Sequence, residues 1–532
     1  MFYIAKRYFK GHSGETLPLW ATESDFKAMT EDNKQELPTL EGKAALDLWR
    51  KGRDAWNLWI TQHPGWDINF NRIDFSAERR SDGNLSFKGY HFGNNGLDFF
   101  ETRFGNGNVD FSDADFGNSQ VNFVKTTFGN GYVNFSKATF GDGSVNFVKA
   151  SFGEGDVNFS ESTFGKGNAN FSQADFGDGS VNFSRTNFGG EVNFISTIFG
   201  NGEVNFEKAT FGGGKIQFME TNFGDGNANF SEATFGDGNV NFFGATLSEG
   251  HLNLEKAIFG KGIVVFSHAN LTMLLFRPNP FGPKAIEGEG LSIKRLAIFV
   301  FPDSSDKLES FGLQGASFGG PLFLSGNLGI VPDLLSTKSS HQVELSELKV
   351  KLRRSWQRFS WPPKLSRVTE DHEDSARLRR LKEIAEANRD HQAALRFSAD
   401  ENRARRWIET SWFGSVLDMA FSAFSDYGQN ILRPFLALLA ISVASMGLYK
   451  IIAAATFAAF WQGPGWGQSA LLSISNSLPF LPQSRDFRAD ALKALYPDDP
   501  SLTVDALMIT QGTLSFVFLF LIGLGLRNRF RL

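Results

Sequence analysis

Candidate catalytic and metal-binding residues are scarce in this 532-residue sequence, and their spacing fits no common site. The sequence has no cysteine, which excludes thiolate nucleophiles, disulfides and cysteine-bound metals. None of its eight histidines falls in an HExxH or HxH spacing. His372, within Glu-Asp-His-Glu-Asp at 370–374, would hold a divalent cation only weakly, and an acidic helix start is the favoured interpretation. The sequence therefore predicts no metal site, no cofactor and no enzyme.

The glycine-rich segments are similar to ligand-binding motifs but lack their required residues. Phe-Gly-Gly-Gly-Lys at 211–215 has no Gly-Lys-Ser/Thr ending, which a phosphate-binding loop needs. The Gly-Asp-Gly runs do not predict a calcium-binding solenoid, because that motif repeats about every nine residues with inward aspartates. These comparisons favour a structural or binding protein.

Polar residues between two apolar segments near the C-terminus are the remaining candidates for a functional site. Residues 469–481 have the length of a short re-entrant helix. If several chains assemble, its small polar side chains would line a pore; the candidates are Ser473, Ser475, Asn476 and Ser477. There is no Thr-Val-Gly-Tyr-Gly filter, so potassium selectivity is not predicted. An external amphipathic loop is the alternative, and the favoured, interpretation.

The dominant feature of the sequence is a repeat, which explains its 57 phenylalanines and 55 glycines against 7 tyrosines. From Phe87 to Phe242 the phenylalanines follow one another at alternating steps of five and seven residues, which makes about thirteen 12-residue units. One step is shorter, from Phe188 to Phe194, where Gly189-Gly190 replaces a Gly-x-Gly corner.

A small or β-branched residue precedes each phenylalanine by two positions, as Val133 precedes Phe135. Because alternate residues of a β-strand share a face, both side chains point inward and the asparagine between them points outward. We expect Gly-x-Gly to form corners at which a positive φ favours glycine. The predicted stack of inward rings includes Phe135, Phe140, Phe147, Phe152, Phe159, Phe164, Phe171, Phe176, Phe183, Phe206 and Phe211.

The unit Ala138-Thr139-Phe140 and its equivalents resemble the repeats of pentapeptide-repeat proteins. The resemblance implies a right-handed quadrilateral β-helix, a β-solenoid, over residues 70–330. Each 12-residue unit would form two faces, so one coil would take 24 residues and residues 70–270 would form roughly eight coils. We expect residues 271–311, which contain several prolines, to interrupt the ladder as an excursion.

The N-terminal segment, residues 1–69, is predicted to cover the first coil, because an open end of a β-helix is a sheet edge. Within it, residues 42–62 predict one capping helix. Its apolar side carries Leu46, Trp49, Ala55, Trp56 and Trp59. The first ten residues lack the apolar stretch of a signal peptide.

Residues 331–431 predict a charged and interfacial helical linker. Residues 374–406 predict one charged helix, either packed on the base of the solenoid or paired with another copy through its apolar seam. Residues 407–427 carry Trp407, Trp412 and several phenylalanines, which are typical of a helix lying in the membrane interface.

Residues 432–532 predict a membrane hairpin. Residues 435–461 contain a single charge, at Lys450, and residues 506–526 contain none. The second segment makes about 31 Å of helix, enough to cross a bilayer. Arginines flank the outer ends of both spans, which predicts cytoplasmic termini and an external loop at 462–505. The predicted location is therefore the inner membrane, as a multi-pass protein with its solenoid in the cytoplasm.

The segment 477–482 and the C-terminal Leu-Gly-Leu-Arg-Asn-Arg-Phe-Arg-Leu resemble a bacterial subgroup of pentapeptide-repeat membrane proteins. Some of these have a two-helix region similar to ion-channel pore modules. The favoured hypothesis is a membrane-anchored scaffold or protein-binding module, whose partners are the bilayer and either another protein or a second copy. The alternative is an oligomeric channel regulated by the β-helix.

A second alternative is a DNA mimic that inhibits a nucleic-acid enzyme. Between Phe87 and Phe266 there are 20 acidic and 11 basic residues, a net charge of −9. DNA carries one negative charge per about 1.7 Å, so a mimic of this length needs more than twice that charge. No nucleic-acid partner is therefore expected.

Overall fold

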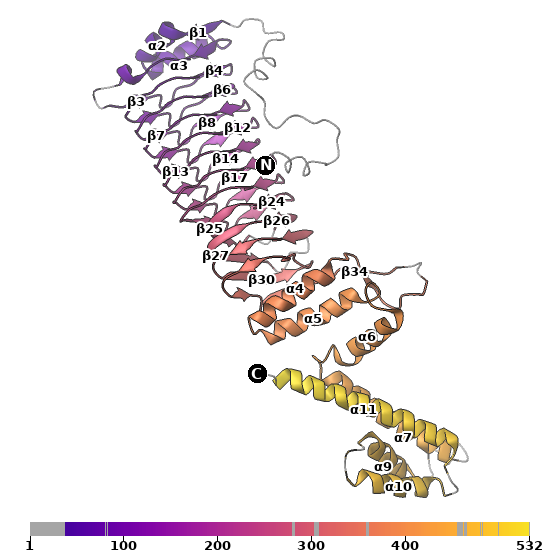
Figure 1. The fold of residues 1–532 in the computed structure, drawn as a ribbon. Helices are drawn as coiled ribbons and strands as arrows, with labels where there is room; N and C mark the ends of the chain where they lie inside the picture. Colours follow the sequence, from indigo (N-terminus) through magenta and orange to yellow (C-terminus); the bar gives the residue numbers. More distant parts are fainter. Residues whose placement is uncertain are drawn as a thin grey trace. The chain divides into compact units, whose positions relative to one another are not determined.

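The computed structural model describes residues 38–79, 81, 83–278, 282–302, 308–357, 361–454, 461, 465–478, 480, 482–497 and 500–530. These residues form a β-solenoid of about 13 turns, with helices before and after it (Figure 1). The chain divides into two compact units, residues 1–226 and 227–532. The prediction that no signal peptide is present concerns residues outside the described ranges.

In the first unit, short parallel strands stack into three sheets, and isolated bridges make a fourth ladder. The first sheet contains β1 (Thr39–Glu41), β2 (Asp67–Asn69), β4 (Leu97–Asp98), β6 (Val121–Asn122), β9 (Val145–Asn146), β12 (Ala169–Asn170), β15 (Val192–Asn193) and β18 (Ile216–Gln217). The second contains β3 (Leu85–Ser86), β5 (Val109–Asp110), β7 (Val133–Asn134), β10 (Val157–Asn158), β13 (Val181–Asn182) and β16 (Val204–Asn205). The third contains β8 (Thr139–Phe140), β11 (Thr163–Phe164), β14 (Asn187–Phe188) and β17 (Thr210–Phe211).

The strand register confirms the predicted coil of 24 residues. Val121 pairs with Val145, and in the next sheet Val133 pairs with Val157, so each ladder partner lies 24 residues along the chain. Across Gly189-Gly190 the offset falls to 23, because Ala169 pairs with Val192. The one-residue deletion is therefore absorbed at a corner without a change of register in the sheets.

The phenylalanines predicted to point inward all do so. All eleven are at most 2% exposed. Rings in successive coils stack in parallel: those of Phe135 and Phe159 lie 4.8 Å apart with an interplanar angle of 1°. Rings on neighbouring faces meet edge to face, as Phe135 and Phe147 do at 5.8 Å and 84°. Both geometries are favourable for aromatic pairs, so the core is a continuous column of interlocked rings.

In the Val-Asn-Phe and Ala-Asn-Phe sequences, the asparagine fixes the corner that follows the phenylalanine. Asn158 Oδ1 accepts a hydrogen bond from the backbone N–H of Ser160 at 2.9 Å, and the equivalent bond recurs in most coils. The backbone of Glu161, two residues after Phe159, has a φ of 59°. The equivalent residues of other coils, among them Lys137 and Lys149, also have a positive φ. Residues other than glycine seldom adopt this left-handed backbone, so the hydrogen-bonded turn must hold them in it.

The structure corrects the reason given for the Gly-x-Gly corners. Gly177 has a positive φ, but Gly165 does not. What the two share is close stacking: a Cβ on Gly165 would lie 2.4 Å from the carbonyl oxygen of Gly141, one coil earlier. Glycine is therefore needed mainly because successive corners pack backbone against backbone.

The N-terminal end of the solenoid is capped by two helices where one was predicted. Helix α2 (Gly42–Arg50) and helix α3 (Arg53–Gln62) are separated at Gly52, whose φ is 90°. The ring of Trp56 is fully buried and stacks on Phe70 at 5.7 Å. The side chain of Asn57 hydrogen-bonds the backbone of the first coil, where the described residues include no preceding coil to do so. It accepts from His91 N at 2.8 Å and donates to Gly89 O at 3.1 Å.

The second unit continues with the same kind of ladders. The first sheet contains β21 (Val240–Asn241), β24 (Ile263–Val265), β26 (Ala285–Glu287) and β28 (Ser310–Gly312). The second contains β19 (Ala228–Asn229), β22 (His251–Asn253), β25 (Asn270–Phe276), β27 (Ser292–Phe301), β29 (Ser317–Phe318) and β31 (Lys338–Ser339), with β30 (Leu322–Leu328), β32 (Val343–Glu344) and β33 (Leu348–Val350) alongside. The third contains β20 (Thr234–Phe235) and β23 (Ile258–Phe259).

The predicted excursion at residues 271–311 is wrong for the described part of this segment, 271–278, 282–302 and 308–311. The strands there lengthen and stay in the ladder, since β25 pairs in parallel with β27 and β26 with β28. Pro278 and Pro302 follow the ends of β25 and β27, where a missing N–H breaks no ladder bond. The solenoid also begins before residue 70, at β1, and continues past residue 330 to β33; its roughly 13 turns thus cover more of the chain than residues 70–270, for which about eight coils were predicted.

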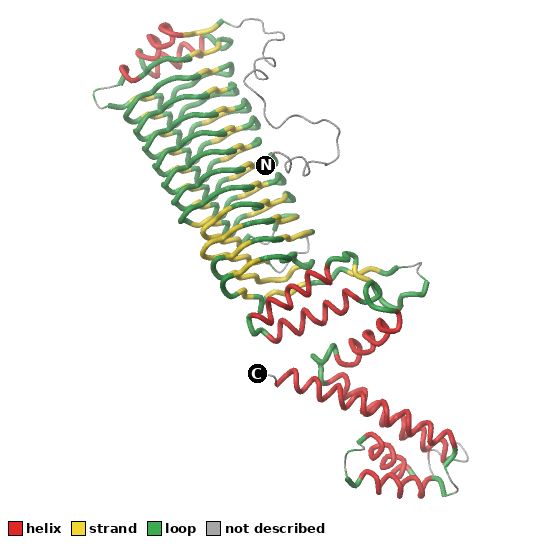
Figure 2. Tube along the Cα trace, viewed as in Figure 1, coloured by secondary structure: helices red, strands yellow, loops and turns green. Residues whose placement is uncertain are grey.

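Helices make up most of the remainder of the second unit (Figure 2). They are α4 (Asp374–Ala387), α5 (His391–Arg405), α6 (Trp412–Ser425), α7 (Leu432–Ala453), α9 (Trp466–Ser477), α10 (Ser484–Leu495) and α11 (Leu502–Phe530), preceded by the antiparallel pair β34 (Arg354–Ser355) and β35 (Val368–Thr369). The single helix predicted over 374–406 is in fact two, because Arg389 has a φ of 61° and Asp390 caps α5. The predicted loop at 462–505 contains α9 and α10.

Candidate functional site: the base of the solenoid and the helical hairpin

Side chains of the helical region complete the last sheet edges of the solenoid. Asn388, which ends α4, accepts from Val343 N at 3.3 Å and donates to Val343 O at 2.8 Å, just as a neighbouring strand would. Arg380 donates to Thr337 O at 2.7 Å. Arg353 donates to two further solenoid carbonyls at 3.0 Å each. Helix α4 therefore packs on the base of the solenoid, one of the two arrangements predicted for this segment.

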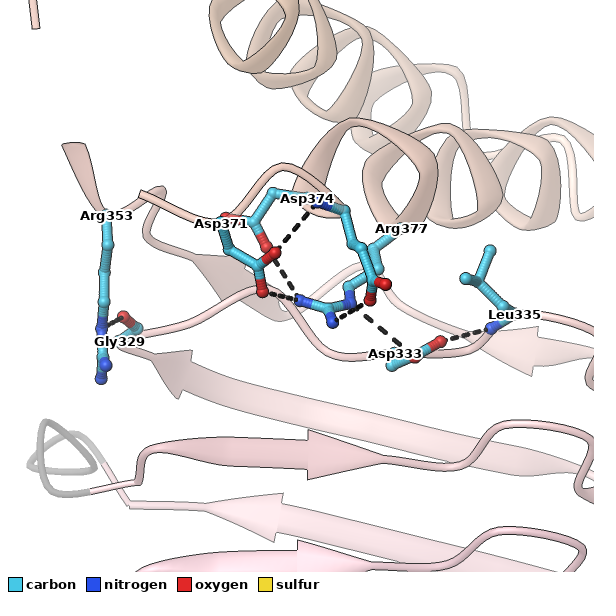
Figure 3. Close-up of polar contacts among 8 residues, drawn as sticks. Gly329, Asp333, Leu335, Arg353, Asp371, Asp374 and Arg377 are labelled. Carbon is cyan, nitrogen blue, oxygen red and sulfur yellow. Dashed lines mark hydrogen bonds and ion pairs between the residues drawn. The ribbon is translucent and has the colours of Figure 1, made fainter. Parts of the chain in front are cut away.

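Arg377 of α4 lies among four carboxylates, three of them at the start of its own helix and one, Asp333, on the solenoid (Figure 3). Its guanidinium lies 2.6 Å from Asp371, 3.2 Å from Asp374 and 2.7 Å from Glu373, and its Nε lies 3.7 Å from Asp333 of the solenoid. Burial, together with the charge of Asp371, raises the pKa of Asp374 to about 6.

The acidic residues around His372 thus bind an arginine. Asp371, Glu373 and Asp374 all face Arg377, and α4 begins at Asp374. Among the described residues no group of three histidine, aspartate or glutamate side chains is arranged to hold a metal ion. The arrangement fixes one structural element on another and offers no open coordination site.

A second buried network links α5 to α6. Arg406 donates to Asp418 at 2.7 Å and to the hydroxyl of Tyr427 at 2.9 Å, and that hydroxyl donates to Asp418 at 3.0 Å. Arg403 pairs with Asp426. Burial raises the pKa of Tyr427 to about 12, so this phenol stays protonated and acts as a donor.

Helix α6 exposes its apolar side and buries its polar side. Phe413 and Leu417 are 66% and 56% exposed, whereas Ser415 and Ser425 are buried. Asp418 on the inner side is held by Arg406. A helix on a water-exposed surface usually has the opposite arrangement, with polar side chains outward and apolar side chains inward.

Two helices of the described chain, α7 and α11, are long and apolar enough to cross a membrane. They have 22 and 29 residues, which at 1.5 Å per residue makes about 33 and 44 Å of helix. Their most apolar windows are only 17% and 22% buried, so most of these side chains face outward. Residues 455–460 of the predicted first span lie outside the described residues.

The four predicted pore residues lie inside the hairpin, where α9 packs against α7 and α11. Ser473, Ser475, Asn476 and Ser477 are each at most 5% exposed. Ser475 donates to a carbonyl of its own helix, Leu472 O, at 3.1 Å. The structure therefore brings three of the four together with partners from other helices, and leaves the fourth bonded within α9.

Gln511 of α11 is the centre of this polar cluster. Its amide nitrogen donates to Ser473 Oγ at 2.8 Å and to Ser477 Oγ at 2.9 Å. Its amide oxygen accepts from Tyr449 at 2.8 Å and from Asn476 at 3.2 Å. Every polar atom of Gln511 is thus used within a single chain, and α7, α9 and α11 are joined through it.

Sequence reasoning missed Gln511 because the most prominent feature of the segment 506–526 is its lack of charge. A lone amide in a long apolar run was the available signal, since such a side chain needs a buried partner. No family model, curated protein or solved structure matches this chain. The functional conclusion therefore depends on the geometry alone.

Proposed function

We propose that this protein is a membrane-anchored scaffold or protein-binding module without catalytic activity. The observation that carries the proposal is the outward apolar surface of α6, α7 and α11, set against their inward polar groups. In lipid these apolar side chains are kept out of water, whereas in water their exposure would cost free energy. The anchor would hold the solenoid at the cytoplasmic face of a bacterial inner membrane.

The repeat supports assignment of the solenoid to the pentapeptide type. The support is the five-plus-seven spacing of phenylalanine and the 24-residue coil. A column of this kind presents outward side chains at a fixed spacing along each ladder, a regular surface suited to docking a partner. In one ladder acidic and basic side chains neighbour each other at most steps, as Arg185 faces Glu161 at 3.9 Å.

The membrane topology is tested with single-cysteine variants of the full chain, since the parent has no cysteine. We expect a membrane-impermeant maleimide to label Asp486→Cys in α10 from outside intact cells, and Lys166→Cys in the solenoid only after the cells are opened. Labelling of Lys166→Cys in intact cells would contradict the cytoplasmic placement. Extraction of the protein from membranes by alkaline carbonate would contradict the anchor itself.

The scaffold role is tested by capture from a cytosolic extract on the full chain in nanodiscs. We expect a defined partner to be retained, and to be lost when charges along one ladder are reversed by Lys137→Glu, Arg185→Glu and Lys208→Glu. These residues are exposed, so the variants keep the buried column intact. Recovery of the same proteins by empty nanodiscs would refute the proposal.

A second candidate function is an oligomeric ion channel. The observation in its favour is the short helix α9, which packs between α7 and α11 at the place of the predicted re-entrant helix. A channel passes current in purified bilayers, and Ser473→Trp alters that current. Absence of current across lipid compositions and voltages, or a monomer in nanodiscs, would rule it out.

A further inference from the structure

The β34–β35 hairpin carries a group of large apolar side chains that stay exposed among the described residues. Trp361 is 94% exposed, Trp356 is 60% exposed and Leu365 is 50% exposed. Tryptophan is the residue most typical of the boundary between lipid headgroups and hydrocarbon, because its ring is apolar and its N–H needs a polar partner.

The same segment is strongly basic. Residues 351–369 contain six lysines and arginines and no aspartate or glutamate. Arg367 is exposed and pairs with no carboxylate among the described residues. Burial, and next the neighbouring Arg403 and Arg406, lower the pKa of Arg354 from its ordinary value, as expected where positive charge is concentrated. Such a surface attracts anionic groups.

The hairpin is joined directly to the start of α6. The indole N–H of Trp412, on α6, donates to Pro363 O at 3.1 Å, and that of Trp407 donates to Ser366 Oγ at 2.7 Å. Helix α6 in turn contacts α11, where Phe424 meets Phe518 at 5.2 Å between ring centroids. The hairpin is thus held to α6, and α6 in turn contacts the long helix α11.

We infer that the β34–β35 hairpin and the exposed side of α6 form one platform that inserts tryptophans into the surface of an anionic bilayer. The inference rests on the proposed membrane anchor and adds a second, lipid-selective contact to it. The apolar side chains enter the interface while Lys364 and Arg367 pair with acidic headgroups. The platform would hold the base of the solenoid against the membrane, so the joint with the anchor would be stiff.

The test uses spin labels on single-cysteine variants of the full chain in nanodiscs. Leu365→Cys reports on the hairpin, Phe516→Cys on the outward side of α11, and Lys166→Cys on a water-exposed corner. Collisions with oxygen, which concentrates in lipid, are compared with collisions with a neutral, water-soluble nickel complex. The nanodiscs contain either phosphatidylcholine alone or a mixture with phosphatidylglycerol.

We expect oxygen to dominate at Phe516→Cys in both lipids and nickel to dominate at Lys166→Cys. At Leu365→Cys we expect nickel collisions to fall and oxygen collisions to rise on going from the neutral to the anionic lipid. Adding Lys364→Glu and Arg367→Glu should return that site to the values of Lys166→Cys, and adding Trp361→Ala should shift it in the same direction.

Three results would overturn the inference. In the first, the label at 365 in anionic lipid collides mainly with nickel, as the label at Lys166→Cys does, while the label at Phe516→Cys still collides mainly with oxygen. This result would refute the platform and leave the proposed anchor intact. Another is a label at 365 that is lipid-exposed to the same extent in both lipids. The last is slow collision with both reagents, which would mean that protein covers the hairpin. If Phe516→Cys itself were exposed to water, the proposed anchor would fail.

Discussion

Removal of one ring from the phenylalanine column gives the sharpest test of how the solenoid is held together. Phe159 is fully buried and stacks on Phe135 at 4.8 Å and on Phe183 at 4.9 Å. It also meets Phe147 and Phe171 edge to face at 5.7 Å each. Phe159→Ala deletes a ring with six ring neighbours and leaves a cavity that neighbouring coils cannot fill without breaking their ladders.

The expected cost is about 3–5 kcal/mol, which is typical of Phe→Ala changes in well-packed cores. Phe159→Leu keeps most of the volume and should cost about 1.5 kcal/mol or less. Phe159→Asp should cost more than Phe159→Ala, because a carboxylate would be buried among rings with no partner. Phe243→Ala is the matched control, since the ring of Phe243 is 36% exposed and its loss should cost well under half as much.

Hydrogen exchange on the full chain measures this cost locally. In a solenoid each coil contacts mainly its neighbours, so the defect should raise exchange in the coils around Phe159 and leave α2 and α3 unchanged. A loss of about 4 kcal/mol corresponds to a rise in exchange rate of roughly a thousandfold. Unchanged protection in the Phe159→Ala variant, or equal effects from Phe159→Ala and Phe243→Ala, would refute the ring column as the source of stability.

Three further predictions concern the corners of the solenoid, the base of the solenoid and the helical hairpin formed by α7, α9 and α11. Gly177→Ala should lower stability by about 2–5 kcal/mol, because it combines left-handed strain with overpacking: its Cβ would lie 1.7 Å from the carbonyl oxygen one coil earlier. Gly213→Ala, with nothing within 4 Å, should be neutral or slightly stabilising in the same melting experiment. Burial raises the pKa of Asp374 to about 6, so the folded state binds this proton more tightly than the unfolded chain does, and its stability falls as the pH rises from about 4 to 6. Asp374→Asn should remove about 3 kcal/mol of that fall, and parallel pH–stability curves for the two proteins would contradict it. Gln511→Leu leaves several buried polar groups unpaired and should destabilise the hairpin by about 2 kcal/mol in detergent unfolding, whereas Thr510→Leu, whose hydroxyl bonds only its own helix, should not.

The repeat could be predicted well because its information is local. The alternation of side chains along a strand places Val133 and Phe135 on one face wherever the strand lies. The deletion at Gly189-Gly190 shortened the coil by one residue, as the spacing indicated. By contrast, the sequence did not show that Asn158 fixes the following corner or that Glu161 would take a left-handed backbone, because both depend on the turn already being formed.

The sequence does not predict the structure of a segment correctly where that structure depends on a hydrogen-bond partner far along the chain. The prolines of residues 271–311 predict an interruption of the ladder. The strands of the preceding coil have free N–H and C=O groups, however, and the longer strands of this segment form hydrogen bonds with them. The helix predicted over 374–406 breaks at Asn388, whose amide is drawn to Val343 of the solenoid, 45 residues earlier.

The amino-acid sequence by itself determined the period of the coil, the inward direction of its rings and the presence of two long apolar segments, because each follows from spacing or composition within a few residues. Only the tertiary structure decided which groups meet: Arg377 with Asp333, Gln511 with Ser473, and Trp412 with the backbone of the β34–β35 hairpin. The partners in these pairs are 38 to 49 residues apart in the chain, and the repeat spacing of the sequence does not predict such contacts. A buried polar group needs a hydrogen-bond partner, and which partner it has is decided only when the surrounding surfaces pack together.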